Sequence, residues 1–105
     1  MQFHSLKILK IVSESSDTRT FYLEIPADLR SDYQHLPGQY LTVKADINGK
    51  EVRRAYSICT SPDAIAPGIT IKKVSKGLMS YYLNDRVREG DSLDIMTPEG
   101  NFVVN

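Results

Sequence analysis

The sequence is short of several residue types, and each shortage excludes a class of protein. It contains one cysteine, Cys59, so it can form neither an internal disulfide nor a four-cysteine zinc or iron–sulfur site. It has no tryptophan, and its 13 basic and 13 acidic residues leave no net charge. A balanced charge gives no long-range field for collecting nucleic acid or an acidic membrane surface. We expect a cytoplasmic protein from a reducing compartment, with Cys59 as a small core residue.

Long apolar runs and metal-binding patterns are also missing. No run approaches the roughly 18 residues of a membrane span. The first segment is interrupted by Lys7 and Lys10, so it lacks the apolar centre of a signal peptide. His4 and His35 have no cysteine or carboxylate at metal-ligand spacing. The 105 residues are enough for one domain, so we predict a single domain over residues 1–105 without a metal or a membrane segment.

The hydrophobic pattern predicts a mainly β fold. Alternating or apolar segments indicate strands at residues 5–13, 18–25, 39–47, 50–58, 69–74 and 92–96. The Asn48–Gly49 pair predicts a tight hairpin between the third and fourth of these. One helix is predicted over residues 75–87, with an apolar stripe at Met79, Tyr82, Leu83 and Val87. Together these elements predict an all-β fold, a six-stranded antiparallel Greek-key barrel with one short α-helix.

The segment "RRAYS" is unusual for a core strand. Arg54 and Tyr56 share a strand face, where a guanidinium can hold phosphate oxygens and a ring can cover an apolar surface. Ser57 adds a hydroxyl, but it has the opposite parity, so it can contact the same ligand only at a strand edge or bend. Taken alone, the segment fits a cross-strand salt bridge and a half-buried tyrosine better than a binding site.

A second candidate site lies where the helix begins, at "KGLMS". Gly77 allows close backbone approach, the helix start can hold an anion, and the Ser80 hydroxyl could reach a phosphate oxygen. Taken alone, an ordinary helix start with an exposed serine explains this segment better than a binding site. Two basic clusters flank the two motifs, and either a bound dianion or solvated strand edges would explain them. The clusters are Lys50, Arg53 and Arg54, and Lys72, Lys73 and Lys76.

Taken in order, these segments resemble one known family. The forms are Arg-x-Tyr-Ser in "RAYS", "TIKKV" at residues 70–74, Gly-x-x-Ser-x-x-Leu in "GLMSYYL", and "PEGNF". They resemble the FAD-binding domain of the ferredoxin–NAD(P)+ reductase superfamily, most of all the reductase components of oxygenases of the phenylacetyl-CoA epoxidase reductase type. The resemblance covers nearly the whole chain.

The resemblance implies a role for each motif. Arg54 would hold the pyrophosphate of FAD, Tyr56 would pack against the flavin, and Ser57 would act catalytically near flavin N5. Backbone groups of Thr70, Ile71 and Lys72 would meet the pyrimidine edge of the flavin. The helix start would hold the pyrophosphate through Gly77, Leu78, Met79 and Ser80.

The resemblance also implies partners. In the family, electrons pass from NAD(P)H through the flavin to an iron–sulfur centre, a ferredoxin or an oxygenase component. This sequence contains neither the family's nicotinamide-binding domain nor its iron–sulfur module. We therefore expect a part of a longer enzyme that holds FAD weakly and does not oxidise NAD(P)H by itself.

Three alternatives remain at this point. The same barrel could bind FMN, because one phosphate can also use Arg54. A small barrel could bind single-stranded nucleic acid, although the zero net charge and the lack of tryptophan disfavour this. It could also be an interaction module, which the presence of Arg54, Tyr56, Ser57 and Ser80 disfavours.

Overall fold

The computed structural model describes residues 2–100, which form six strands, two short 3-10 turns and one α-helix. In chain order these are β1 (Phe3–Ser15), β2 (Thr18–Glu24), η1 (Ala27–Leu29), η2 (Ser31–Tyr33), β3 (Tyr40–Ile47), β4 (Lys50–Ser57), β5 (Gly68–Lys72), α1 (Leu78–Asp85) and β6 (Ser92–Met96). No helix among these residues is long and apolar enough to cross a membrane. The six strands and the single α-helix confirm the predicted element types.

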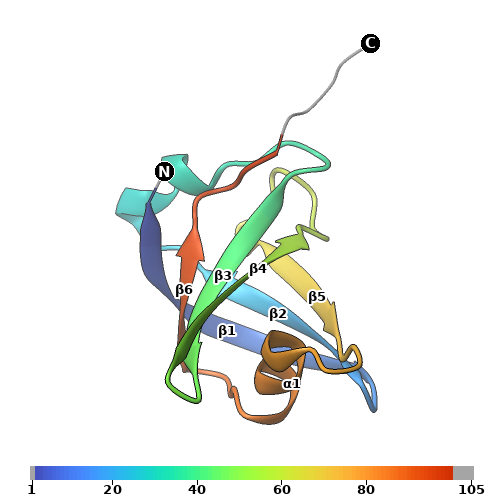
Figure 1. Ribbon diagram of the computed structural model, residues 1–105. Coiled ribbons are helices and arrows are strands. Elements are labelled where there is room, and N and C mark those ends of the chain that lie inside the picture. Colours follow the sequence, from blue (N-terminus) through green and yellow to red (C-terminus); the bar gives the residue numbers. More distant parts are fainter. Residues whose placement is uncertain (1, 101–105) are drawn as a thin grey trace.

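The strands form one curled antiparallel sheet in the order β4-β3-β6-β1-β2-β5 (Figure 1). The two end strands, β4 and β5, approach each other because the sheet curls. They are joined at one end, where Ile58 bridges Ile69 and the Cys59 N–H donates to the Gly68 carbonyl at 2.9 Å. Along the rest of their length they diverge, and α1 lies at the open end. The predicted barrel is therefore present, with an opening between β4 and β5 that we call the seam.

The β3–β4 hairpin sets which side chains face the interior. Asn48 and Gly49 have φ of 54° and 81°, the paired positive values of the predicted tight turn. The turn places Arg54 opposite Val43 and Tyr56 opposite Leu41. Directly opposed residues of an antiparallel pair share a face, so Arg54 and Tyr56 lie on the core-facing side of the sheet.

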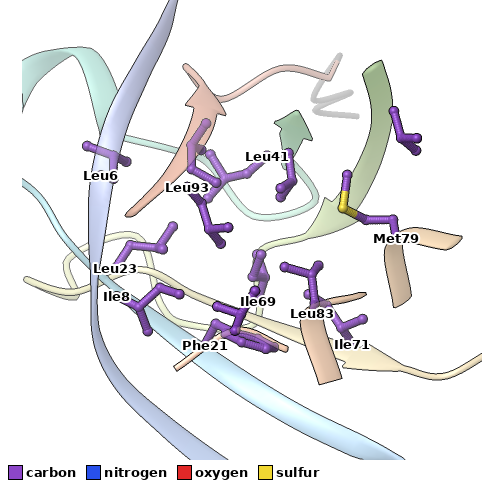
Figure 2. Close-up of a cluster of buried hydrophobic side chains, with 14 of the residues drawn as sticks. Leu6, Ile8, Phe21, Leu23, Leu41, Ile69, Ile71, Met79, Leu83 and Leu93 are labelled. Carbon is purple, nitrogen blue, oxygen red and sulfur yellow. The ribbon is translucent and has the colours of Figure 1, made fainter. Parts of the chain in front are cut away.

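The core lies inside the curl of the sheet, under α1 (Figure 2). It follows from the period of two along each strand, which turns every second residue inward. The fully buried members are Leu6, Ile8, Phe21, Leu23, Leu41, Val43, Ile69, Ile71, Met79, Leu83 and Ile95. Met79 and Leu83 come from α1, so the helix is fixed to the sheet by its apolar stripe.

Two expectations are corrected. The helix ends at Asp85, before the predicted residue 87, because the Arg19 guanidinium bonds the carbonyls of Leu83, Asn84 and Val87 at 2.7, 2.8 and 3.0 Å. Cys59 is exposed, not a core residue. Its neighbour Ile58 packs against the core, so the alternation along the chain turns Cys59 outward.

Candidate functional site at the seam and the start of the helix

Arg54 is a cation on the core-facing side of the sheet without an acidic partner. Among residues 2–100 the ion pairs are Arg53 with Glu51 at 3.0 Å and Lys73 with Asp85 at 2.7 Å. The Arg54 guanidinium instead donates from Nη1 to the carbonyl of Arg53 at 2.7 Å and remains exposed. The salt bridge that would give Arg54 a structural role is therefore not formed, and its other donors are available to a ligand.

Tyr56 lies beside Arg54 and is half-buried. Burial raises the pKa of its hydroxyl, and the positive charge of Arg54 opposes that shift. The tyrosine is consequently neutral over the physiological range, with one part against the core and one part accessible. A ring in this position can support a flat ligand placed next to the guanidinium.

Arg53 belongs to the other side of the sheet. Its guanidinium lies 5.0 Å from the centre of the Phe3 ring and pairs with Glu51, and both partners of the pair are exposed. Because successive side chains of β4 point to opposite faces, Arg53 and Arg54 do not form the single cluster that the sequence suggested. Arg54 faces the seam, whereas Arg53 does not.

The main chain of β5 directs hydrogen-bonding groups into the seam. The Leu23 N–H donates to Pro67 and the Lys73 N–H donates to Asp17, so odd-numbered residues of this segment bond β2. Alternation then points the N–H and C=O groups of Thr70 and Lys72 toward β4. Ile71 differs, because its side chain is buried and its carbonyl accepts a hydrogen bond from Asn84 Nδ2 at 3.2 Å.

The edge of β4 also directs main-chain hydrogen-bonding groups into the seam, opposite those of β5. The Ile58 N–H donates to the Gln39 carbonyl at 3.2 Å, so the even-numbered residues of β4 bond β3. The main-chain groups of Ala55 and Ser57 therefore face the seam. Because β4 is an edge strand and Ser57 is its last residue, the Ser57 main chain faces the seam, while its side chain keeps the opposite parity to that of Tyr56.

The start of α1 is prepared for an anion. No side chain of the described residues caps it, and its first turn contains no acidic residue. The first N–H with an intrahelical partner is that of Tyr81, which bonds the Gly77 carbonyl at 3.1 Å. The N–H groups of Leu78, Met79 and Ser80 thus carry the helix's partial positive charge. Met79 is 1% exposed, so it can offer only its backbone.

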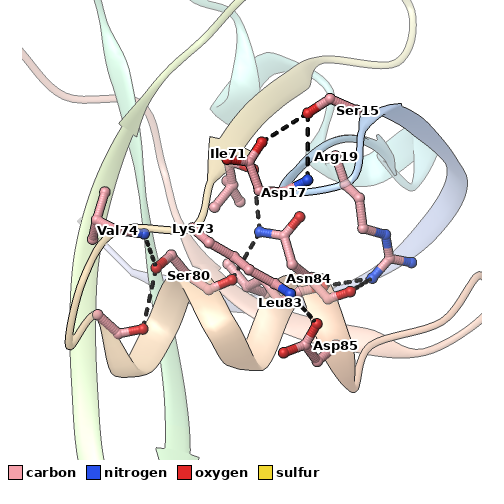
Figure 3. Close-up of polar contacts among 11 residues, drawn as sticks. Ser15, Asp17, Arg19, Ile71, Lys73, Val74, Ser80, Leu83, Asn84 and Asp85 are labelled. Atoms are coloured by element: carbon pink, nitrogen blue, oxygen red, sulfur yellow. Dashed lines mark hydrogen bonds and ion pairs between the residues drawn. The ribbon is translucent and has the colours of Figure 1, made fainter.

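Ser80 holds this loop in place. Its hydroxyl accepts from the Val74 N–H at 3.1 Å and donates to the Gly77 carbonyl at 3.1 Å (Figure 3). Ser80 is 4% exposed, and its hydroxyl proton is already donated to the Gly77 carbonyl. In this arrangement Ser80 offers an anion its backbone N–H, and its hydroxyl shapes the loop.

Sequence reasoning missed the residues that brace the site. Arg19 joins β2 to the end of α1, and Asn84 Nδ2 joins β5 to α1 by donating to Ile71 and, at 2.8 Å, to Ser80 (Figure 3). Arg19 has the same strand parity as Phe21 and Leu23. A charged residue on an otherwise apolar strand face was the available signal that Arg19 has a partly buried, structural role.

The residues at the seam and the helix start fit a flavin nucleotide. An unpaired arginine and uncapped helix N–H groups suit phosphate, and opposed free strand edges suit the polar edge of a flavin ring. A Cβ at Gly77 would lie 2.5 Å from Val74 Cγ2, so only glycine fits this loop without displacement. Among residues 2–100 no group of three His, Cys, Asp or Glu side chains could hold a metal ion.

Comparison with known proteins decides the family. Residues 5–104 match the oxidoreductase FAD-binding domain family. The chain belongs to this family. A relative in Escherichia coli, one of the subunits of 1,2-phenylacetyl-CoA epoxidase, is 40% identical over 102 residues, which are 95% of this chain and 28% of the relative. The resemblance inferred from the motifs is confirmed.

Solved structures agree with this membership. The FAD/NAD-binding domain of nitric oxide dioxygenase from Vibrio cholerae superposes with a TM-score of 0.85 and 26% identity, covering 100% of this chain and 47% of that one. Phthalate dioxygenase reductase superposes with a TM-score of 0.75 and 27% identity, covering 98% of this chain and 32% of that one. This FAD-binding domain thus spans less than half of each of these proteins.

Proposed function

We propose that this domain binds FAD in the seam and is the flavin-binding part of an NAD(P)H-dependent electron-transfer oxidoreductase. The observation that carries the proposal is Arg54, a cation on the core-facing side of an edge strand that forms no ion pair within residues 2–100 and lies next to the half-buried Tyr56. Arg54 has no acidic partner among residues 2–100, so a bound phosphate would give its charge a partner. Family membership supports the same cofactor.

In this proposal each part of the site has one task. Arg54 and the N–H groups at the start of α1 neutralise and position the phosphates. Tyr56 supports the ring system, while the main chains of Ser57, Thr70 and Lys72 bond its polar edge. Bound FAD would supply the redox chemistry, and the protein contributes position and electrostatics.

The Ser57 side chain is the proposed catalytic group. Its hydroxyl is exposed at the end of β4, beside the bridge that closes the barrel. A hydroxyl there can donate to or accept from a reacting ring atom. We assign Ser57 to the hydride step and Arg54 to retention of the cofactor.

The proposed electron partners lie outside this domain. Phthalate dioxygenase reductase is described as a modular structure for electron transfer from pyridine nucleotides to a 2Fe–2S centre. The relative from Escherichia coli is part of an epoxidase by its name. Both support a nicotinamide-binding domain as donor and an iron–sulfur or oxygenase component as acceptor.

The test is a flavin titration with a matched pair of arginine variants. Purified protein is titrated with FAD, following absorbance and the quenching of flavin fluorescence. Arg54→Ala removes charge-assisted hydrogen bonds of about 1.5–3 kcal/mol, so affinity should fall about ten- to a hundredfold. Arg53→Ala removes an exposed pair worth about 0–1 kcal/mol on the other face and should leave affinity unchanged.

Two results would contradict the proposal. The protein could show no uptake of any flavin, which would remove the function altogether. Alternatively, Arg54→Ala could bind FAD as tightly as the wild type but unfold at a lower temperature. That second pattern would make Arg54 a structural residue.

A further inference from the structure

The Asn84 side chain touches both halves of the proposed flavin site. Its Nδ2 donates to the Ile71 carbonyl at 3.2 Å and to the Ser80 carbonyl at 2.8 Å (Figure 3). Ile71 lies in β5 between Thr70 and Lys72, whose main-chain groups face the seam. Ser80 is one of the three residues that present N–H groups at the start of α1. One nitrogen atom therefore joins the strand edge proposed for the flavin ring to the helix start proposed for the phosphates.

The orientation of the Asn84 amide follows from the atoms that it touches. Both are carbonyl oxygens, which only accept hydrogen bonds, so the amide nitrogen must face them. The amide oxygen, Oδ1, is then buried without a hydrogen-bond partner among residues 2–100, and no other buried side-chain atom of these residues is left in that state. A buried acceptor without a donor destabilises a fold.

The two hydrogen bonds of Asn84 add little to stability in return. Ile71 is paired with Arg19 of β2, and the odd-numbered residues of β5 bond β2 through their main chain. The Ser80 carbonyl lies four residues before Asn84, so the helix itself gives it a main-chain donor. Both carbonyls are thus satisfied without the side chain, and the gain from the additional bonds is comparable with the cost of the unpaired Oδ1. Stability alone does not account for an asparagine at this position.

The other contacts of α1 leave its position relative to β5 open. The helix rests on the sheet through its apolar stripe, and hydrophobic contact has no preferred direction. Arg19 and the partly exposed pair of Lys73 with Asp85 act at the end of the helix. Among residues 2–100, the side-chain hydrogen bond between α1 and β5 is that of Asn84 to Ile71. Asn84 is therefore placed to set the position of the helix relative to the seam.

We propose that Asn84 is a positioning residue that fixes the spacing between the two halves of the site, so that one FAD molecule contacts both at once. The inference rests on the proposed flavin function of the seam. A ligand with two linked parts binds more tightly than either part alone only if the protein holds the two sites at a matching distance. Asn84 contacts no cofactor atom in this role, because it acts through Ile71 and Ser80.

The experiment is a double-mutant cycle on FAD affinity, measured by fluorescence titration. Asn84→Ala and Asn84→Leu both remove the amide, and the leucine variant keeps an apolar side chain in its place. Each should weaken FAD binding about ten- to a hundredfold, because the two halves no longer match one ligand. Their Tm should change by no more than about 4 °C, since the lost bonds and the removed Oδ1 offset each other.

Two further variants distinguish positioning from a purely structural role. Arg54→Ala weakens the phosphate half, so Asn84→Ala in that background should cost no more than about threefold in FAD affinity. Tyr33→Phe is the control for stability, because it loses a buried hydrogen bond to Ile95 of β6. It should lower Tm and leave FAD affinity as in the wild type.

Each remaining outcome decides against the proposal. FAD affinity within about twofold of the wild type in both Asn84 variants would overturn it. An equal loss in the Arg54→Ala background would show that Asn84 acts independently of the phosphate contacts. A Tm decrease well beyond about 4 °C in both Asn84 variants, or a matching loss of FAD affinity in Tyr33→Phe, would make the effect one of stability. If the wild type binds no FAD, the flavin function itself fails and this inference fails with it.

Discussion

Gly77→Ala tests whether the loop before α1 is shaped for its task. A Cβ at this position would lie 2.5 Å from Val74 Cγ2, 2.6 Å from Ser80 Oγ and 3.0 Å from the Val74 carbonyl oxygen. The φ of Gly77 is −84°, which any residue can adopt, so the penalty comes from crowding alone. Relief requires Val74 to move or the Ser80 hydroxyl to give up its two hydrogen bonds.

The magnitude follows from two opposing terms. Overpacking costs about 1–3 kcal/mol, whereas alanine restricts the unfolded chain and returns about 0.4–1 kcal/mol. At the middle of both ranges the net loss in free energy of unfolding is about 1.3 kcal/mol, or a decrease in Tm of about 5–10 °C for a domain of this size. FAD affinity should fall as well, because the displaced loop carries the first N–H groups of α1.

The assay combines thermal unfolding by circular dichroism with FAD titration. Ser75→Ala, an exposed change in the same loop, is the control and should match the wild type. Adding Val74→Ala to Gly77→Ala removes the nearest clashing atom and should restore part of the lost Tm. A wild-type Tm for Gly77→Ala, or a double variant no more stable than Gly77→Ala, would refute the crowding argument.

Three further predictions follow from named contacts. Burial raises the pKa of Tyr33 to about 12, while the unfolded tyrosine titrates near 10, so the free energy of unfolding should decrease between about pH 10 and 12. Tyr33→Phe removes the titrating hydroxyl together with its 2.6 Å hydrogen bond to the Ile95 carbonyl. Urea unfolding at pH 9 and pH 11 should therefore show a smaller decrease in the free energy of unfolding for the variant than for the wild type. An identical pH dependence would contradict the assignment. Arg19→Lys replaces the two guanidinium nitrogens that reach three carbonyls by a single ammonium nitrogen, and it should lower the free energy of unfolding by about 2 kcal/mol. The exposed control Arg88→Lys should cause no such loss, and equal losses would refute the capping role. Ser57→Ala, placed in a protein that includes the nicotinamide-binding domain, should slow flavin reduction in stopped-flow measurements more than it weakens FAD binding; a wild-type rate would remove Ser57 as a catalytic residue.

The parts of the fold that depend on local patterns could be predicted. Asn48 and Gly49 specify the hairpin because both adopt positive φ, and alternation along residues 18–25 specifies β2. The apolar spacing of Met79 and Leu83 identified the helix face that is buried. The motifs around Arg54 and Gly77 identified the family because their order along the chain is specific.

The parts that depend on distant contacts could not be predicted. Arg19 ends α1 from 64 residues away, so no periodicity in residues 75–87 could place the helix end at Asp85. The exposure of Cys59 follows from the bridge between Ile58 and Ile69, which exists only once the sheet has curled. The hydrogen bond that the Ser80 hydroxyl accepts from the Val74 N–H depends on the path of the loop, so it could not be predicted from the sequence either.

The seam has a consequence for how the protein behaves in solution without its cofactor. Where β4 and β5 diverge, two lengths of backbone present unpaired N–H and C=O groups, the surface through which sheets of separate molecules join. Arg53 and Lys72, exposed on these two strands, hinder such joining but do not occupy the bonding positions. A ligand in the seam occupies them directly. With FAD in the seam, as proposed, we expect less self-association than in the cofactor-free protein, so the cofactor would limit aggregation through this edge.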